Sequence, residues 1–245
     1  MTGKGKRHRM TFGSLFSGIG GMDLGLERAG MVCKWQVEID PFCQKVLAKH
    51  WPDVKRYGDI REVNGNELES VDLIAGGFPC QDVSAIGLRR GVDAGQRSGL
   101  YREMLRLVRH LRPGIVLMEN VSGLFVDGLG RVLGDLAEIG YDSEWHCLSA
   151  CAFGAPHPRE RVFILAYPEG KGPQTGGILR RVTPGSAECS NCRPNYLGSW
   201  PSASGIVGVA DGVPNRMDRV KSLGNAVVPQ VAEWIGRRIL EFSHG

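Results

Sequence analysis

The feature that most constrains the fold is a regular alternation between short apolar runs and amphipathic segments over residues 11–166. The apolar runs cover residues 12–16, 32–37, 71–75, 115–118, 145–150 and 161–166, and the amphipathic segments cover residues 21–29, 41–49, 100–111 and 130–139. Runs of the first kind predict buried strands, and segments of the second kind predict helices. Strands that alternate with helices predict an α/β fold with a doubly wound, mostly parallel sheet.

The domain organisation follows from a change in composition after this region. Residues 168–215 contain nine glycines and six prolines and show no sustained periodicity, which predicts a short irregular insert. Helical spacing returns within residues 220–241. We therefore divide the chain into a basic tail (1–10), an α/β domain (11–167), the insert (168–215) and a C-terminal segment (216–245) that returns to the α/β domain.

Composition and charge narrow the class of protein. The chain has 245 residues, of which 42% are hydrophobic and 23% are charged, as is ordinary for a globular protein. No apolar run approaches the roughly 20 residues of a membrane span, and no export signal follows the basic N-terminus, so we expect no membrane partner. Seven cysteines without a disulfide-like spacing predict reduced thiols inside a cell.

Glycines and acids follow the first three predicted strands. The turn Phe16-Ser17-Gly18-Ile19-Gly20-Gly21 opens a helix, Glu38 ends the second strand, and Asp59 ends a short third strand. Ligands of doubly wound sheets bind outside the carboxyl ends of the strands, where an acid can hydrogen-bond a ribose. The pattern favours a ribose-bearing cofactor with an adenine, although a tight turn and two surface acids would look the same.

The later strand ends carry candidate catalytic groups. Cys80 follows Pro79 after the fourth strand, Glu119 ends the fifth, and Arg159 and Arg161 enter the last. A cysteine thiolate is a strong nucleophile, and a buried carboxylate can act as a proton donor. Two arginines at positions i and i+2 of a strand point to the same face. Each residue also has an interpretation without a catalytic role: Cys80 as an inert core thiol, Glu119 as a helix-terminal acid, and the two arginines as a surface pair.

The order of these motifs resembles that of the DNA (cytosine-5)-methyltransferase family. LFSGIGGMDLGLERAG is similar to the first cofactor motif of that family, GGFPCQDVS to its nucleophile motif and MENVSGL to its ENV motif. PHPRERVFIL resembles the Q-x-R-x-R motif, and SLGNAVVPQVAEWIG resembles the closing GN-x-V motif and its helix. The resemblance extends from Thr11 to Gly236, except for the insert. It implies a Rossmann-like methyltransferase fold, S-adenosylmethionine as cofactor and double-stranded DNA as substrate.

The resemblance also implies a role for each motif residue. Cys80 would attack C6 of a cytosine flipped out of the duplex, Glu119 would donate a proton to N3, and Arg161 would hold the base carbonyl, with Arg159 beside it. The residues implied for the cofactor pocket are Phe16, Gly18, Gly20, Glu38, Asp59, Pro79, Leu100 and Asn225. Arg89, Arg90 and Arg97 lie in a loop after the nucleophile and would contact DNA phosphates.

Three departures from the family pattern qualify these expectations. His157 stands where the family usually has glutamine, and Ile39 stands where an aromatic residue often stacks on the adenine, which implies weaker cofactor binding. The insert, of about fifty residues, is shorter than the usual target-recognition domain. We therefore expect a short or relaxed target sequence, or specificity supplied by another chain; the sequence leaves open whether the protein is a monomer. A small form without an export signal fits the cytoplasm of a bacterial or phage-infected cell.

Other readings stay open at this point. A minority branch of the family modifies transfer RNA, and a non-catalytic or partner-dependent DNA-binding remnant would share the same motifs. Cys189 and Cys192 form half of a structural zinc site, but no second ligand pair is evident, so we expect no metal.

Overall fold

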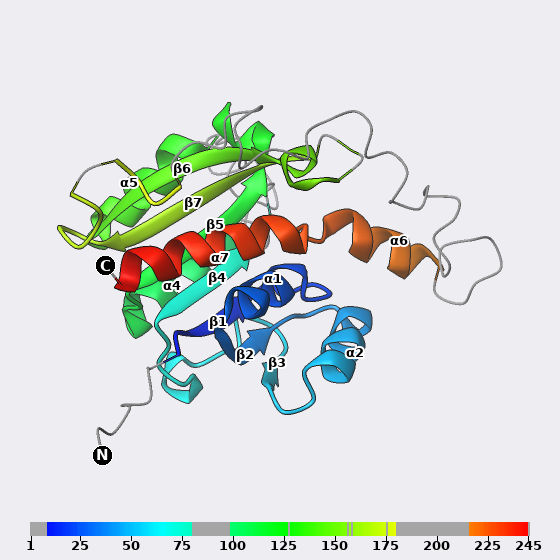
Figure 1. The fold of residues 1–245 in the computed structure, drawn as a ribbon. Helices are drawn as coiled ribbons and strands as arrows, with labels where there is room; N and C mark the ends of the chain where they lie inside the picture. The colour runs from blue at the N-terminus through cyan, green and yellow to red at the C-terminus, as the bar shows by residue number, and fades with distance from the viewer. Residues whose placement is uncertain are drawn as a thin grey trace, which may run out of the picture.

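The computed structural model describes residues 9–79, 99–126, 128–155, 157, 159–174, 176–179 and 216–244 (Figure 1). The strands are β1 (Thr11–Leu15), β2 (Val32–Val37), β3 (Lys55–Tyr57), β4 (Leu73–Gly77), β5 (Ile115–Val121), β6 (Tyr141–Ser149) and β7 (Glu160–Pro168). The α-helices are α1 (Gly21–Ala29), α2 (Pro41–His50), α4 (Gly99–Leu111), α5 (Leu129–Glu138), α6 (Arg216–Asn225) and α7 (Pro229–His244). Short 3₁₀ turns are η1 (Gly65–Glu67), η2 (Ser122–Phe125) and η3 (Ala150–Phe153).

The seven strands form one sheet in the order β3-β2-β1-β4-β5-β7-β6. In this order, the five strands from β3 to β5 are parallel to one another, whereas β7 is antiparallel to both β5 and β6. The prediction of a mostly parallel, doubly wound α/β sheet is confirmed. The direction of β7 was not predicted, because a short apolar run carries no information on strand direction.

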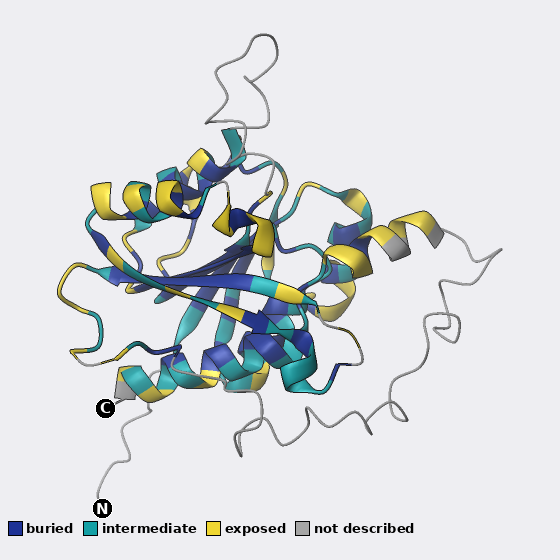
Figure 2. Cartoon of the chain, turned by 90° about the horizontal axis from the view of Figure 1, so that it is seen from above, coloured by how far each residue is buried: buried dark blue, intermediate teal, exposed yellow. Residues whose placement is uncertain are grey.

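Helices cover both faces of the sheet, as the alternating residues of the central strands require (Figure 2). On one face, Ile74 and Val116 belong to a core cluster with α4 and α5. On the other face, Leu73 and Leu117 belong to a second cluster with α1 and α7. Successive side chains of a strand point to opposite faces, so a strand that is apolar at every position must be covered on both sides.

Several predicted boundaries need correction. Strand β5 continues to Val121, so the ENV motif lies inside the strand and not after it. The C-terminal segment is two helices and not one: α6 ends at Asn225 and α7 begins at Pro229. A proline lacks an N–H and disfavours helical backbone in the residue before it, which explains the break. Of the predicted insert, residues 180–215 lie outside the described part of the chain.

The first and last described helices, α1 and α7, pack side by side although they lie at opposite ends of the chain (Figure 1). A Cβ atom placed on Gly25 would lie 2.4 Å from the carbonyl oxygen of Pro229 and 2.5 Å from the Cβ of Ala232. On α7, a Cβ atom on Gly236 would lie 2.8 Å from the Cβ of Ala29. The two helices therefore approach each other at positions that have no side chain.

We expect Gly25→Ala to lower the free energy of unfolding by about 1–3 kcal/mol, because the added methyl group forces α7 away from α1. The matched control is Gly134→Ala in α5, where an added Cβ meets nothing within 4 Å. This control should raise stability by up to about 1 kcal/mol through helix propensity. Urea unfolding of both variants measures the difference, and equal shifts would contradict the close packing of α1 and α7.

Candidate functional site

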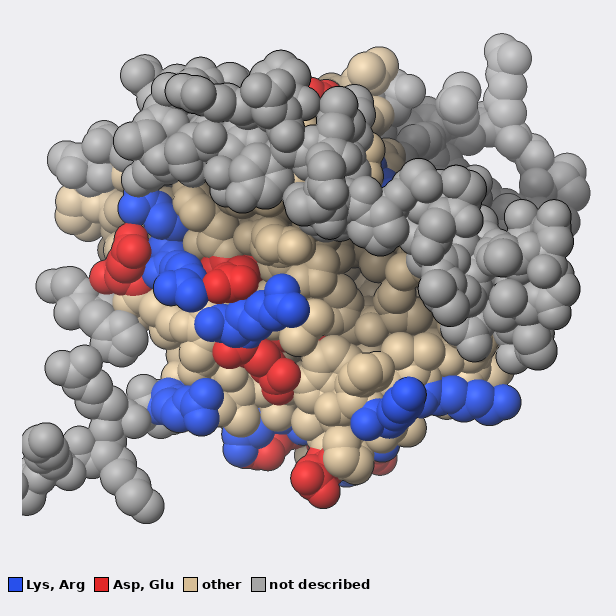
Figure 3. All heavy atoms as spheres, turned by 45° about the vertical axis from the view of Figure 1, so that its right-hand side comes forward, with Lys and Arg blue, Asp and Glu red and all other residues tan. Residues whose placement is uncertain are grey.

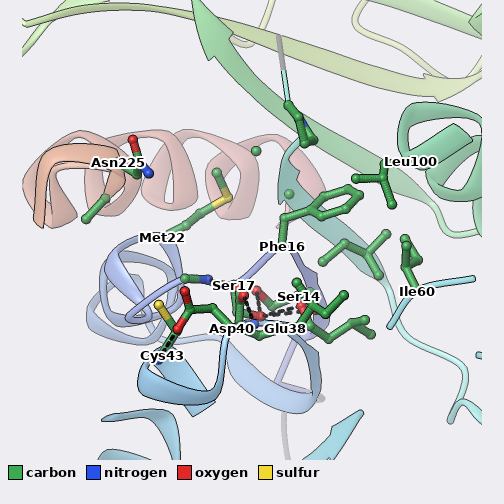
Figure 4. Close-up of a pocket in the computed structure, with 18 of the residues that line it drawn as sticks. Ser14, Phe16, Ser17, Met22, Glu38, Asp40, Cys43, Ile60, Leu100 and Asn225 are labelled. Atoms are coloured by element: carbon green, nitrogen blue, oxygen red, sulfur yellow. Dashed lines mark hydrogen bonds between the residues drawn. The ribbon is translucent and has the colours of Figure 1, made fainter. Parts of the chain in front are cut away.

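A cavity of about 580 Å³ lies at the carboxyl ends of the parallel strands and is closed by α6 and by Ala226 and Val227, which connect α6 to α7 (Figure 4). Seven of the eight predicted cofactor residues line it: Phe16, Gly18, Glu38, Asp59, Pro79, Leu100 and Asn225. Glu119 also lines this cavity. Segments that are far apart in the sequence thus meet around one space.

The turn between β1 and α1 forms the floor of the cavity with an unusual backbone. Phe16 and Gly18 both have positive φ angles, 54° and 55°. Gly20 (φ 83°) is not among the lining residues: a Cβ there would lie 2.4 Å from the ring of Trp51. The structure therefore assigns Gly20 to packing between the turn and Trp51, and the turn itself reaches the cavity through Phe16 and Gly18.

Glu38 holds this turn from the end of β2. One carboxylate oxygen accepts a hydrogen bond from the N–H of Gly18 at 2.7 Å, and the other accepts one from the N–H of Asp40 at 2.8 Å. Asp40 in turn caps α2 by accepting from the N–H groups of Phe42 and Cys43. A carboxylate oxygen can accept two hydrogen bonds, and each Glu38 oxygen accepts one here from the described residues, so the carboxylate is oriented and suited to bind a ligand hydroxyl.

Asp59 is also held in place by the protein's own groups. The Nε–H of Arg61 is shared between the two carboxylate oxygens, each at 2.9 Å, and Nη2 donates to Oδ2. The backbone N–H of Arg61 donates to Oδ1. The Arg61 guanidinium holds the pKa of Asp59 below its usual value. Arg61 lines the cavity and was not predicted from the sequence.

Residues of α6 complete the opposite wall. The ammonium group of Lys221 lies 3.7 Å from the carboxylate of Asp40, and the hydroxyl of Ser222 lies 3.5 Å from the thiol of Cys43. These contacts join α6 to α2 across the cavity. The sequence analysis did not predict Lys221 and Ser222 as site residues, although they lie about one helical turn before the predicted Asn225.

The carboxylate of Glu119 lies at the other end of the cavity and is 8% exposed. Its Oε1 atom is 2.9 Å from Nε of Arg161. Burial raises the pKa of Glu119 above its ordinary value, although the positive charges of Arg161 and Arg159 act in the opposite direction. A carboxyl group in this setting can carry a proton at a higher pH than an exposed one.

Arg159 adds a second cation beside this pair. Burial, together with the charge of Arg161, lowers the pKa of Arg159. Its Nε and Nη2 atoms are buried and have no hydrogen-bond partner among the residues that the structure describes. These two donors form one edge of the guanidinium fork, whose geometry matches the oxygens of a carboxylate or phosphate. Beside Glu119, the two arginines leave one positive charge in excess.

The nucleophile motif is only partly described. Phe78 is buried against the ring of Tyr101, with ring centroids 5.0 Å apart, and Pro79 lines the cavity. The side-chain amide of Asn120 donates a hydrogen bond to the carbonyl of Phe78 at 2.9 Å, which ties the end of β4 to the end of β5. Cys80, Arg89, Arg90 and Arg97, the predicted nucleophile and phosphate contacts, lie outside the described residues.

The described residues hold no group of three or more histidine, cysteine or acidic side chains able to bind a metal ion. Cys189 and Cys192, the candidate half of a zinc site, lie outside the described part of the chain.

Within the described part of the chain, no helix is both long and apolar enough to cross a membrane. On the face drawn in Figure 3, the described lysine and arginine side chains are interspersed with acidic ones.

A buried polar cluster supports the floor of the cavity. Asp23, fully buried in α1, accepts hydrogen bonds of 2.9 Å from the hydroxyl of Ser14 and from the amide of Gln36. The hydroxyl of Ser17 donates to that of Ser14 at 2.9 Å, and both serines line the cavity. Burial raises the pKa of Asp23 to about 6, and the hydrogen bonds from Gln36 and Ser14 limit the rise.

Asp23 should make stability depend on pH in a defined direction. The pKa of Asp23 is higher in the folded state than in the unfolded state. Its favourable contribution to the free energy of unfolding is therefore complete below pH 4 and is lost as the pH rises through about 6. The folded-state and unfolded-state pKa values differ by about two units, which corresponds to about 3 kcal/mol in the free energy of unfolding. We expect Asp23→Asn to remove this decline, as measured by urea unfolding between pH 4 and 7. Asp53→Asn, at an exposed site, should keep it, and parallel pH profiles for both variants would contradict the assignment.

Comparison with known proteins identifies the class of chain that carries this site. The family model "C-5 cytosine-specific DNA methylase" matches residues 10–189. The Type II methyltransferase M2.BsuMI of Bacillus subtilis strain 168 is 41% identical over 161 residues, which cover 62% of this chain and 41% of the relative. M.AquIA of Picosynechococcus sp. is 38% identical over 180 residues, which cover 64% of this chain and 72% of that relative.

Solved structures give a consistent result. An E. coli prophage protein described as a DNA modification methyltransferase has a TM-score of 0.54 and 29% identity, over 65% of this chain and 47% of the other. A Spodoptera frugiperda DNMT2 variant has a TM-score of 0.58 over 71% of this chain and 54% of the other; at 22% identity this likeness shows the fold alone. The chain spans about half or less of most of the curated relatives it matches first. The resemblance expected from the motifs is confirmed: the chain belongs to the C-5 cytosine-specific DNA methylase family.

Proposed function

We propose that the chain transfers a methyl group from S-adenosylmethionine to C5 of cytosine in double-stranded DNA. The observation that carries the proposal is the continuity of the cavity. One space joins the oriented acids Glu38 and Asp59 to the buried Glu119, whose pKa is raised by burial. Such a space suits a ribose-bearing ligand at one end and a base that must be protonated at the other.

The residues present fit the implied cofactor. The cavity volume, about 580 Å³, lies within the range of sites for small organic ligands. Glu38 is suited to the ribose hydroxyls and Asp59 to an adenine amine. Ile39 is 60% exposed beside Glu38, an apolar surface that an adenine ring would cover. When bound, S-adenosylmethionine supplies an electrophilic methyl group on a sulfonium.

The chain's own residues would activate the base. The thiolate of Cys80 forms a bond to C6 of the cytosine, N3 receives a proton from Glu119, and C5 becomes nucleophilic enough to accept the methyl group. A water molecule then takes the C5 proton, and the bond between the Cys80 sulfur and C6 breaks, which restores the thiolate and the C5–C6 double bond. N3 returns its proton to Glu119. Arg161 keeps the Glu119 carboxyl in position and is suited to hold the base carbonyl.

The DNA would meet this site through its backbone. A cytosine must leave the duplex to reach a buried carboxyl group, at a cost of a few kcal/mol. The unpartnered fork of Arg159 and the excess positive charge beside Glu119 suit a phosphodiester next to the extruded base. Arg89, Arg90 and Arg97 are proposed as further phosphate contacts. Base recognition is assigned to the insert or to a second chain.

The test is transfer of labelled methyl groups to unmethylated bacterial DNA, with the methylated positions read by bisulfite sequencing. We expect Cys80→Ala to abolish transfer. Glu119→Gln should lower the rate by about 10²–10⁴-fold with little change in cofactor affinity, because the neutral amide cannot donate the required proton. Glu138→Gln, at an exposed position of α5, is the matched control and should behave as the wild type.

The other outcomes are informative. A full rate in Glu119→Gln would contradict the proton-donor role. Cofactor binding without transfer to any DNA would support the partner-dependent or non-catalytic alternative, and transfer to transfer RNA would support the RNA alternative. The bases that flank the methylated cytosines would show directly whether the target sequence is short. A defined site of six base pairs or more for this chain alone would contradict relaxed recognition.

A further inference from the structure

Gly77 and Glu119 face each other across the boundary between β4 and β5. They are direct partners in the parallel register of the two strands. A Cβ atom placed on Gly77 would lie 2.6 Å from Oε2 of Glu119, a separation that real Cβ contacts do not show. The carboxylate therefore lies in the space that a side chain at position 77 would fill.

The carboxylate has little freedom to avoid such a side chain. Its other oxygen, Oε1, lies 2.9 Å from Nε of Arg161, and the residue is almost fully buried. Behind it, the hydrogen bond from Asn120 to the carbonyl of Phe78 ties the two strand ends together. A methyl group at position 77 would have to push Oε2 toward the open cavity, because the strands cannot separate without breaking this link.

We propose that Gly77 is a positioning residue for Glu119, required because only a residue without a side chain lets the carboxyl group lie buried over the end of β4. The inference rests on the methyl-transfer function proposed above. It assigns a role to the second glycine of GGFPC that differs from backbone flexibility: the glycine provides space for a catalytic side chain on the neighbouring strand.

Displacement of the carboxyl group has a predictable electrostatic effect. Burial is the largest cause of the raised pKa of Glu119. A carboxyl group pushed toward the cavity is better hydrated and farther from its buried position, so its pKa should fall. The protonated form required by the reaction would then be lost at a lower pH.

The first experiment compares Gly77→Ala with Gly114→Ala. At Gly114, just before β5, an added Cβ has an ordinary contact of 3.5 Å with the carbonyl oxygen of Asp72 and does not reach Glu119. We expect Gly77→Ala to lower kcat by about tenfold or more and to change the KM for the cofactor by less than about threefold. The basic limb of the pH–rate profile should move to lower pH. Gly114→Ala should match the wild type in all three.

A second experiment does not depend on activity. The pKa of Glu119 should be lower in Gly77→Ala than in the wild type. It is measured in both proteins by carbon NMR titration of the labelled carboxyl group. Unfolding in urea should show that Gly77→Ala lowers the midpoint in the wild-type background and has little effect in a Glu119→Ala background, where the space is vacant. This cycle separates crowding against the carboxylate from a general need for glycine.

The outcomes are distinct. An unchanged pH profile and an unchanged pKa of Glu119, with equal losses of stability in both backgrounds, would overturn the positioning role. If the wild-type protein transfers no methyl group, the proposed function fails, while the NMR titration and the stability cycle still decide whether Gly77 positions Glu119.

Discussion

The ion pair between Glu119 and Arg161 is the interaction on which the arrangement of the site depends. It joins the end of β5 to the start of β7 and lies at the inner end of the cavity. Because β7 runs antiparallel to β5, its first residues lie next to the last residues of β5, at the same edge of the sheet as the ends of β1 and β4. A parallel β7 would have placed both arginines at the opposite edge, far from Glu119.

This pair also explains why the neighbouring contacts are so closely defined. Ion pairs removed from water stabilise a protein only when their geometry and remaining hydrogen bonds are well satisfied. Glu119 fits because Gly77 leaves space beside it, and the strand ends are fixed because Asn120 holds the carbonyl of Phe78. Within the described part of the chain, two donors of the second arginine, Arg159, have no partner. These two donors are suited to an anion.

The cofactor end of the cavity is built in a different way, by contacts between segments that are distant in the chain. Glu38 fixes the backbone of the β1–α1 turn, and Asp40 links α2 to Lys221 on α6. The helix α7 then packs against α1 at glycine positions that admit no side chain. The C-terminal segment therefore contributes both to the cavity wall and to the stability of the domain.

Much of the fold could be predicted because it depends on local periodicity. The apolar runs and amphipathic segments predicted the strands and helices to within a few residues, and the residues at the strand ends predicted most of the cavity lining. The errors have physical reasons. The antiparallel direction of β7, the position of Gly20 against Trp51 and the partners of Asp40 depend on contacts between distant segments, which no local pattern contains.

The sequence by itself determined the class of fold and the chemical groups available at the strand ends, because side-chain periodicity and motif order are local properties of the chain. Only the tertiary structure decided how those groups meet. Strand direction brought Arg161 to Glu119, register placed Gly77 opposite Glu119, and helix packing brought Asn225 to the cavity. The pKa of Glu119 illustrates the difference. Its carboxyl group is encoded by one residue of β5, but its burial depends on the neighbouring strands, and its charged neighbours Arg159 and Arg161 lie at the start of β7.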